Sequence, residues 1–136
     1  MSGTALAEEA EKLLGRPFRL HGRDPRTGLD CIGLLAAALA ATGREVDFPT
    51  GYRIRTCHFE GLPALAATHG FRRVNDNAAA GDVLLTRPGP GQLHLVIAAT
   101  RPRHFIEAHA GIGRVILRPS SSGDRVLQHW RLIDQA

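Results

Sequence analysis

The chain has 136 residues, 43% of them apolar and 22% charged, which is typical of a soluble globular protein with one domain spanning residues 1–136. The formal net charge is +4 and comes almost wholly from arginine, because Lys12 is the only lysine. The arginines are scattered singly or in pairs without interleaved aromatic residues, so we expect no nucleic-acid partner. No stretch approaches the roughly 20 apolar residues of a membrane span, so we expect no membrane partner either.

The N-terminal segment and the two cysteines indicate where the protein is made and whether it relies on disulfide bonds. Residues 1–14 lack the cationic start and apolar run of a secretory signal. We therefore expect a chain that is made as a soluble cytoplasmic protein or is carried out of the cell by a larger assembly. Two cysteines, Cys31 and Cys57, are too few for a disulfide framework. Cys57 has no base near it in the sequence, and we interpret it as structural.

The N-terminal half of the chain has helical patterns. The spacing of apolar residues predicts an amphipathic helix over residues 4–14. Its apolar face comprises Leu6, Ala10, Leu13 and Leu14. A loop with turn residues is expected from 16 to 29. Residues 31–42 are apolar on nearly every side, which predicts a buried helix, and Asp30 occupies the position of its N-cap.

The C-terminal half changes to short segments separated by Gly, Pro, Asn or Ser. Between the halves, we expect a loop over 47–51, a helix that begins near Tyr52 and a short helix over 62–69. The later segments predict an antiparallel meander. Its strands are expected over 71–74, 82–86, 93–100, 104–109, 114–118 and 128–132. Helices followed by strands predict an α+β fold, with a helical N-terminal half packed on a five- or six-stranded antiparallel sheet.

Cys31 is the first candidate for catalysis because it begins a helix. A helix N-terminus carries free N–H groups and a partial positive charge, which favour a thiolate over a thiol. A thiolate is a nucleophile at neutral pH. The alternative is that Cys31 is a small core residue, since free cysteine is among the most buried residue types.

A nucleophilic cysteine needs a base, and His94 has a suitable setting. It lies in an alternating segment that predicts a strand with His94 among aliphatic residues. The alternative is a core histidine with satisfied hydrogen bonds. The strand over 104–109 offers Glu107 and His109 as a third group, and both lie on one face, so their spacing leaves both open. Cys31, His94 and His109 lack the paired spacing of a zinc site, and we expect no metal and no cofactor.

Four blocks of the sequence resemble the NlpC family of papain-like cell-wall cysteine peptidases. Residues 13–35 include G-R-P-F and G-L-D-C-I-G-L, which are similar to the family's G-x-P-Y and G-x-D-C-S-G-L. The segments A-G-D-V-L-L, H-L-V-I-A and F-I-E-A follow in the family's order. The apolar residue after the cysteine and the basic chain resemble the phage-tail and gene-transfer-agent branch. The resemblance implies a papain-like fold and hydrolysis of an amide bond in peptidoglycan stem peptides.

The resemblance also implies roles for individual residues. Cys31 matches the nucleophile, His94 the general base, and Glu107 the third polar position. The backbone N–H of Cys31 would contribute to an oxyanion hole. Asp30 matches an aspartate that helps to hold the free amine of the substrate, and His109 is placed with it among the substrate-binding residues.

Two residues depart from the family pattern. Phe18 stands where the family has tyrosine, and Ile32 stands where it has serine; both positions are expected to contact substrate. The two missing hydroxyls favour an alternative function, a non-catalytic tail-assembly protein that keeps the fold. A third alternative is a cysteine acyltransferase or amidase on the same scaffold. The expected partners are a peptidoglycan peptide and other tail or particle proteins, with delivery to the cell wall in a phage-like particle.

Overall fold

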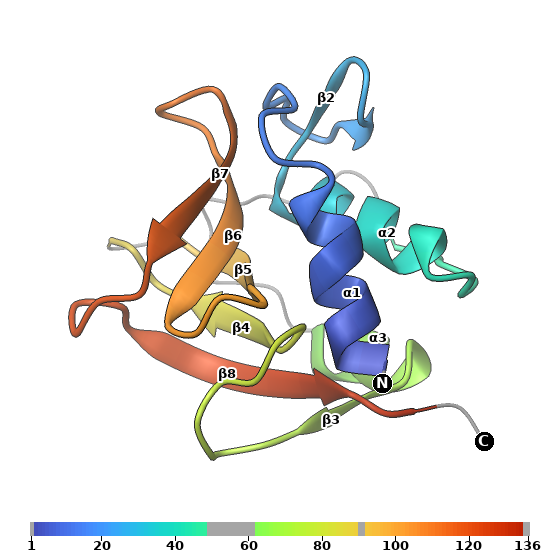
Figure 1. Ribbon diagram of the computed structural model, residues 1–136, viewed down its shortest axis with the longest axis vertical. Coiled ribbons are helices and arrows are strands. Elements are labelled where there is room, and N and C mark those ends of the chain that lie inside the picture. Colours follow the sequence, from blue (N-terminus) through green and yellow to red (C-terminus); the bar gives the residue numbers. More distant parts are fainter. Residues whose placement is uncertain (1, 49–61, 90–91, 135–136) are drawn as a thin grey trace.

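The computed structural model describes residues 2–48, 62–89 and 92–134. The strands of the main sheet come from the C-terminal half, as the sequence predicts, and the helices lie to one side of it (Figure 1). The loop predicted over 16–29 is wrong in part, because residues 23–24 and 28–29 pair as a small two-stranded sheet. Within the described ranges, the helices are α1 (Ser2–Glu11), α2 (Cys31–Ala41) and α3 (Leu62–Thr68). The strands are β1 (Arg23–Asp24), β2 (Gly28–Leu29), β3 (Phe71–Arg73), β4 (Val83–Thr86), β5 (His94–Ala98), β6 (His104–His109), β7 (Arg114–Pro119) and β8 (Val126–Leu132). The α+β prediction is confirmed.

The central helix α2 begins and ends where its sequence indicates. The side chain of Asp30 accepts a hydrogen bond from the backbone N–H of Gly33 at 2.8 Å, as expected of an N-cap. Thr42 caps the other end, and Gly43 follows with φ +92°, a conformation that glycine adopts without strain. Because both ends are capped, the first residue of the helix, Cys31, has a defined position.

The first helix is shorter than predicted. α1 ends at Glu11, and a turn from 12 to 15 carries the chain to Gly15, which has φ +87°. The prediction that Leu14 lies on the buried face is therefore wrong, since its side chain is 37% exposed. Leu13 packs partly against the core, and Ala7 is buried in place of Leu14.

The main sheet has the order β3-β8-β4-β5-β6-β7, and all neighbouring strands are antiparallel. The predicted meander is confirmed for β4 to β7, but it is wrong for the last strand, because β8 lies between β3 and β4. This position buries Trp130 opposite Val83 and Leu132 opposite Phe71, under the helical layer. A strand added after β7 would leave these side chains at the far edge of the sheet.

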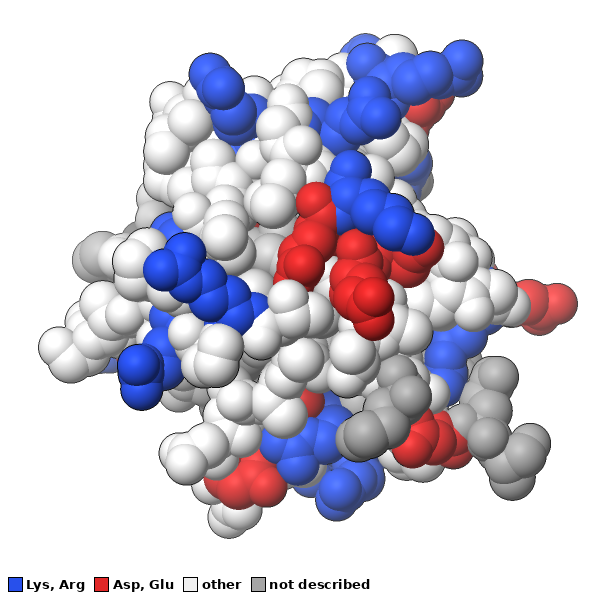
Figure 2. Space-filling model, viewed as in Figure 1, with Lys and Arg blue, Asp and Glu red and all other residues white. Residues whose placement is uncertain are grey.

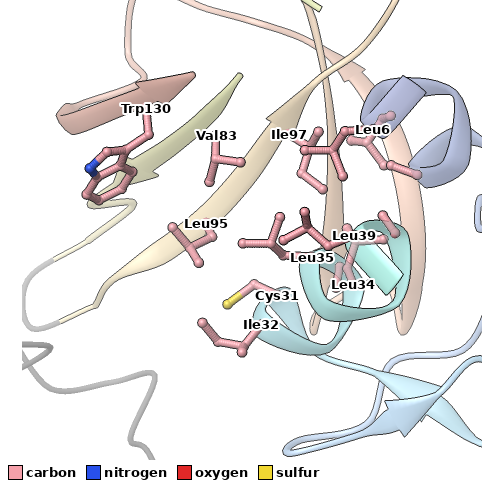
Figure 3. Close-up of a cluster of buried hydrophobic side chains, with 14 of the residues drawn as sticks. Leu6, Cys31, Ile32, Leu34, Leu35, Leu39, Val83, Leu95, Ile97 and Trp130 are labelled. Atoms are coloured by element: carbon pink, nitrogen blue, oxygen red, sulfur yellow. The ribbon is translucent and has the colours of Figure 1, made fainter. Parts of the chain in front are cut away.

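Two apolar clusters cover the two faces of the sheet. The larger lies between sheet and helices and runs from Leu6 of α1 past Leu39 and Ile97 to Trp130 (Figure 3). The smaller lies on the opposite face. It comprises Leu84, Val96, Ala98 and Phe105. The alternation predicted for β5 is thus confirmed, since Ile97 and Val96 belong to different clusters.

Charged residues are distributed without a single basic patch on the face in Figure 2. Acidic side chains gather near the centre of this face, over α1, and arginine and lysine side chains surround them (Figure 2). Among residues 2–48, 62–89 and 92–134, no helix has the length and apolar character of a membrane span. The predicted loop over 47–51, the helix near Tyr52 and the interpretation of Cys57 fall wholly or largely outside the described residues.

Candidate active site

Cys31 lies at the first turn of α2, directly after the capping residue Asp30. Figure 3 shows its sulfur pointing away from the helix, beside Ile32. The residue is only 5% exposed, but it lines a cavity of about 550 Å³. The helix N-terminus therefore acts on a thiol that a substrate in the cavity can reach.

His94 is the first residue of β5 and contacts two other polar side chains. Its Nε2 lies 3.3 Å from Oε2 of Glu107, and the imidazole is hydrogen-bonded to the side chain of Cys31. Since Nε2 is paired with Glu107, we infer that Nδ1 serves the contact with Cys31. The three residues come from α2, β5 and β6 and form one continuous line of side chains.

The structure distinguishes Glu107 from His109 as the partner of His94, whereas their spacing in the sequence left both open. Both lie on β6 with side chains on the same face, but only Glu107 is paired with His94. Nδ1 of His109 instead accepts a hydrogen bond from the backbone N–H of Ile112 at 3.0 Å. His109 thus lines the cavity from the end of β6 and is not paired with His94.

The environment of His94 favours its charged form. Burial lowers the pKa of His94, but the hydrogen bonds and negative charges of Cys31 and Glu107 raise it more, so that its pKa rises from 6.5 to about 9. Burial raises the pKa of Glu107, while the contacts and charges of His94 and Arg118 lower it, and the net effect is a lowered pKa. At neutral pH the site therefore contains an imidazolium and a carboxylate in contact.

A thiol, an imidazole and a carboxylate thus meet at one cavity, and cysteine nucleophiles use these three groups. The family model described as the NlpC/P60 family matches residues 15–131, which include all three side chains. The chain belongs to the NlpC/P60 family. No curated protein matches the chain.

Solved structures of NlpC/P60 domains share this fold. The NlpC/p60 domain of the peptidoglycan hydrolase SagA is 28% identical with a TM-score of 0.58, over 86% of this chain and 88% of that chain. NlpC1 from Trichomonas vaginalis is 19% identical with a TM-score of 0.68, over 95% of this chain and 44% of that chain. The P60 domain of an antigen from M. avium subspecies paratuberculosis is 21% identical with a TM-score of 0.61, over 98% and 96% of the two chains. The last two identities show the fold alone.

The predicted substrate-binding residues of this NlpC/P60 domain divide into two groups. Phe18 and His109 line the cavity. Ile32 does not, because its side chain is 4% exposed and belongs to the core between helices and sheet. The predicted contact of Ile32 with substrate stays a prediction.

Asp30 is fully buried and is not among the residues that line the cavity. Besides capping α2, its Oδ2 accepts a hydrogen bond from the backbone N–H of His21 at 2.8 Å, and its Oδ1 lies 3.7 Å from Nη1 of Arg23. The carboxylate joins the loop over 19–23 to the start of the helix. Its described contacts are structural, and its predicted contact with a substrate amine stays a prediction.

Arg118 was missed by the sequence analysis. Its Nε lies 3.1 Å from Oε2 of Glu107, and its terminal nitrogens bind Asp124 in the loop before β8. The sequence points to Arg118 only once the pairing of β6 with β7 is known. In the register of β6 and β7, Arg118 lies opposite Phe105 and diagonal to Glu107, within reach of a long side chain.

The site offers no obvious place for a metal. Within the described ranges, no group of three or more His, Cys, Asp or Glu side chains is arranged to hold a metal ion. The donor set near the sulfur is one thiol, one imidazole and one carboxylate in a line, whereas a metal site needs its ligands to converge on one point.

Proposed function

We propose that the protein is a cysteine peptidase that hydrolyses an amide bond in peptidoglycan stem peptides. The observation that carries the proposal is the Cys31–His94–Glu107 line, which ends with a thiol at a helix N-terminus in a cavity of about 550 Å³. A cavity of this volume is within the range of sites for small ligands and short peptides.

The proposed reaction has two steps. The Cys31 thiolate attacks the carbonyl carbon and forms a C–S bond, while the backbone N–H of Cys31 stabilises the oxyanion. Nδ1 of His94 gives its proton to the leaving amine as the C–N bond breaks, which leaves a thioester. Water then attacks the thioester, gives a proton back to Nδ1, and the C–S bond breaks to release the acid and the thiolate. Glu107 accepts from Nε2–H throughout and keeps the ring in the correct orientation.

The substrate class is supported by the family and by charge. SagA, the 28% identical relative, is described as a peptidoglycan hydrolase. The formal net charge of +4 suits an anionic cell-wall polymer. Within stem peptides, we favour the bond between D-glutamate and the diamino acid, and delivery in a phage-like tail, on the sequence resemblance described above.

The experiment that tests this proposal is digestion of purified stem peptides. The wild-type protein is expected to release a free α-amine at the diamino acid, detected by mass spectrometry. The Cys31→Ala variant is expected to release none, because no other described side chain in the cavity is a comparable nucleophile. A wild-type protein that cleaves neither stem peptides nor intact peptidoglycan would contradict the proposal.

That negative outcome would favour a non-catalytic tail-assembly protein. The specific observation for this second candidate is the loss of hydroxyl groups at Phe18, which lines the cavity, and at Ile32, which lies in the core. It predicts that the Cys31→Ala variant assembles into particles as well as the wild type does, and it predicts an ordinary, slowly alkylated thiol.

A further inference from the structure

Arg118 contacts the same oxygen of Glu107 as His94 does. Its Nε lies 3.1 Å from Glu107 Oε2, the same oxygen that lies 3.3 Å from His94 Nε2. Its Nη1 and Nη2 donate to Asp124 Oδ2 and Oδ1 at 3.1 and 3.0 Å, in the paired geometry that an arginine and a carboxylate favour. Its Cζ also lies 5.3 Å from the centre of the Phe105 ring. The guanidinium is therefore held from three directions.

The burial of Glu107 makes a permanent cation necessary. The residue is 4% exposed, and a carboxylate removed from water tends to take up a proton unless a positive charge lies beside it. In the proposed reaction, His94 supplies that charge only while it is an imidazolium. Arg118 is charged at every step, because a guanidinium does not lose its proton in proteins. Both side chains contribute to the lowered pKa of Glu107.

The charge of Glu107 decides which nitrogen of neutral His94 carries the proton. An ionised carboxylate can only accept a hydrogen bond, so it selects the Nε2–H tautomer and leaves Nδ1 open to the thiol. A protonated Glu107 would be able to donate to Nε2, and the imidazole would then carry its proton on Nδ1. That tautomer has no free nitrogen with which to accept a proton from Cys31 or from water.

We propose that Arg118, held in place by Asp124, is a positioning residue that keeps Glu107 ionised and directed at His94 through the whole catalytic cycle. The proposal rests on the proposed function for its reaction, but the arrangement of charges exists without any substrate. Side chains with charge or a titratable group surround Glu107 from several elements. They are His94 from β5, Arg118 from β7, Asp124 from the loop before β8, and Cys31 from α2 beyond His94; Arg125 and His109 line the same cavity.

The test is the pH dependence of alkylation of Cys31 by iodoacetamide, followed by mass spectrometry of the peptide that contains Cys31. In Arg118→Met, Glu107 is expected to take up a proton at higher pH than in the wild type. The imidazolium of His94 then loses its carboxylate partner, and the thiolate of Cys31 in turn loses the imidazolium. We expect the acid limb of the profile to move to higher pH in Arg118→Met. Arg118→Lys keeps the charge, and its acid limb is expected to stay close to that of the wild type.

The matched control is Arg26→Met. Arg26 pairs with Asp24 on the surface with its side chain 85% exposed, and its loss is expected to leave the profile unchanged. Circular dichroism reports whether each variant folds, and if Arg118→Met does not, Arg118→Gln supplies the same comparison with Arg118→Lys. A uniform loss of rate at every pH, or a shift in the lysine variant as large as in the neutral one, would overturn the proposal. A shifted acid limb in a protein that cleaves no peptidoglycan would overturn only the proposed function.

Discussion

His94 uses its two ring nitrogens for two different partners, and this division of contacts governs its chemistry. Glu107 occupies Nε2, so proton exchange with the sulfur and the substrate takes place at Nδ1. Both partners of the ring are negative when ionised, and this is why contact with them outweighs the effect of burial on the pKa of His94. A histidine in such a place is an acid in its resting state and a base only after it has given up its proton.

The raised pKa of His94 predicts the alkaline limit of activity. Since the imidazolium must protonate the leaving amine, kcat/KM on a stem peptide is expected to fall as pH rises through about 9, the pKa of His94. The same shift gives a stability contribution that is fully present below the unfolded pKa of 6.5 and is lost as pH rises through about 9. NMR titration of the imidazole checks both. A His94 midpoint near 6.5 in the folded protein would contradict the ion pair with Cys31 and Glu107.

At the scale of elements, the sequence predicts the positions of Cys31 and His94 well. Asp30 before an all-apolar run indicates a capped, buried helix, and strict alternation around His94 indicates a strand; both signals are local. Glu107 and His109 could not be distinguished, because period-two geometry places them on the same face, and only the side-chain contact with His94 selects Glu107. The role of Arg118 was not predictable for the same reason, since it depends on a diagonal contact between two strands.

The N-cap of α2, Asp30, is expected to contribute to the stability of the protein. Asp30→Ala removes a buried acceptor from Gly33 N–H and His21 N–H, and is expected to lower the free energy of unfolding by about 2 kcal/mol, the upper end for an N-cap. Asp30→Asn keeps an acceptor and is expected to lose less. Urea denaturation measures both, and Asp24→Ala, at the end of β1 with its side chain 44% exposed, is the control. If Asp30→Ala kept its stability and only raised KM for a stem peptide, the residue would serve the substrate and not the helix.

At the scale of the whole molecule, the stability of the sheet depends on the position of β8. β8 lies between β3 and β4, so the end of the chain holds the sheet together. A second set of buried polar groups reinforces this position. Asp82, just before β4, is fully buried; its Oδ2 lies 2.6 Å from His129 Nε2, and both its oxygens accept from Arg131 of β8. The insertion of β8 was not predictable from local patterns, because it is a matter of which distant strands bury Trp130.

This cluster predicts a strong dependence of stability on Asp82. Asp82→Ala leaves Arg131 and His129 partly buried without their shared acceptor, and loss of one member of such a buried set costs about 3–5 kcal/mol. Asp76 also binds Arg131, but its side chain is 61% exposed, so Asp76→Ala is expected to lower the free energy of unfolding far less than Asp82→Ala does. Urea denaturation of the two variants measures how much the buried partner and the exposed partner of Arg131 each contribute to the free energy of unfolding. Equal losses would mean that Arg131 is anchored by the surface pair. A much larger loss for Asp82→Ala would mean that β8 is fixed mainly by its buried contact with Asp82, next to β4 inside the sheet.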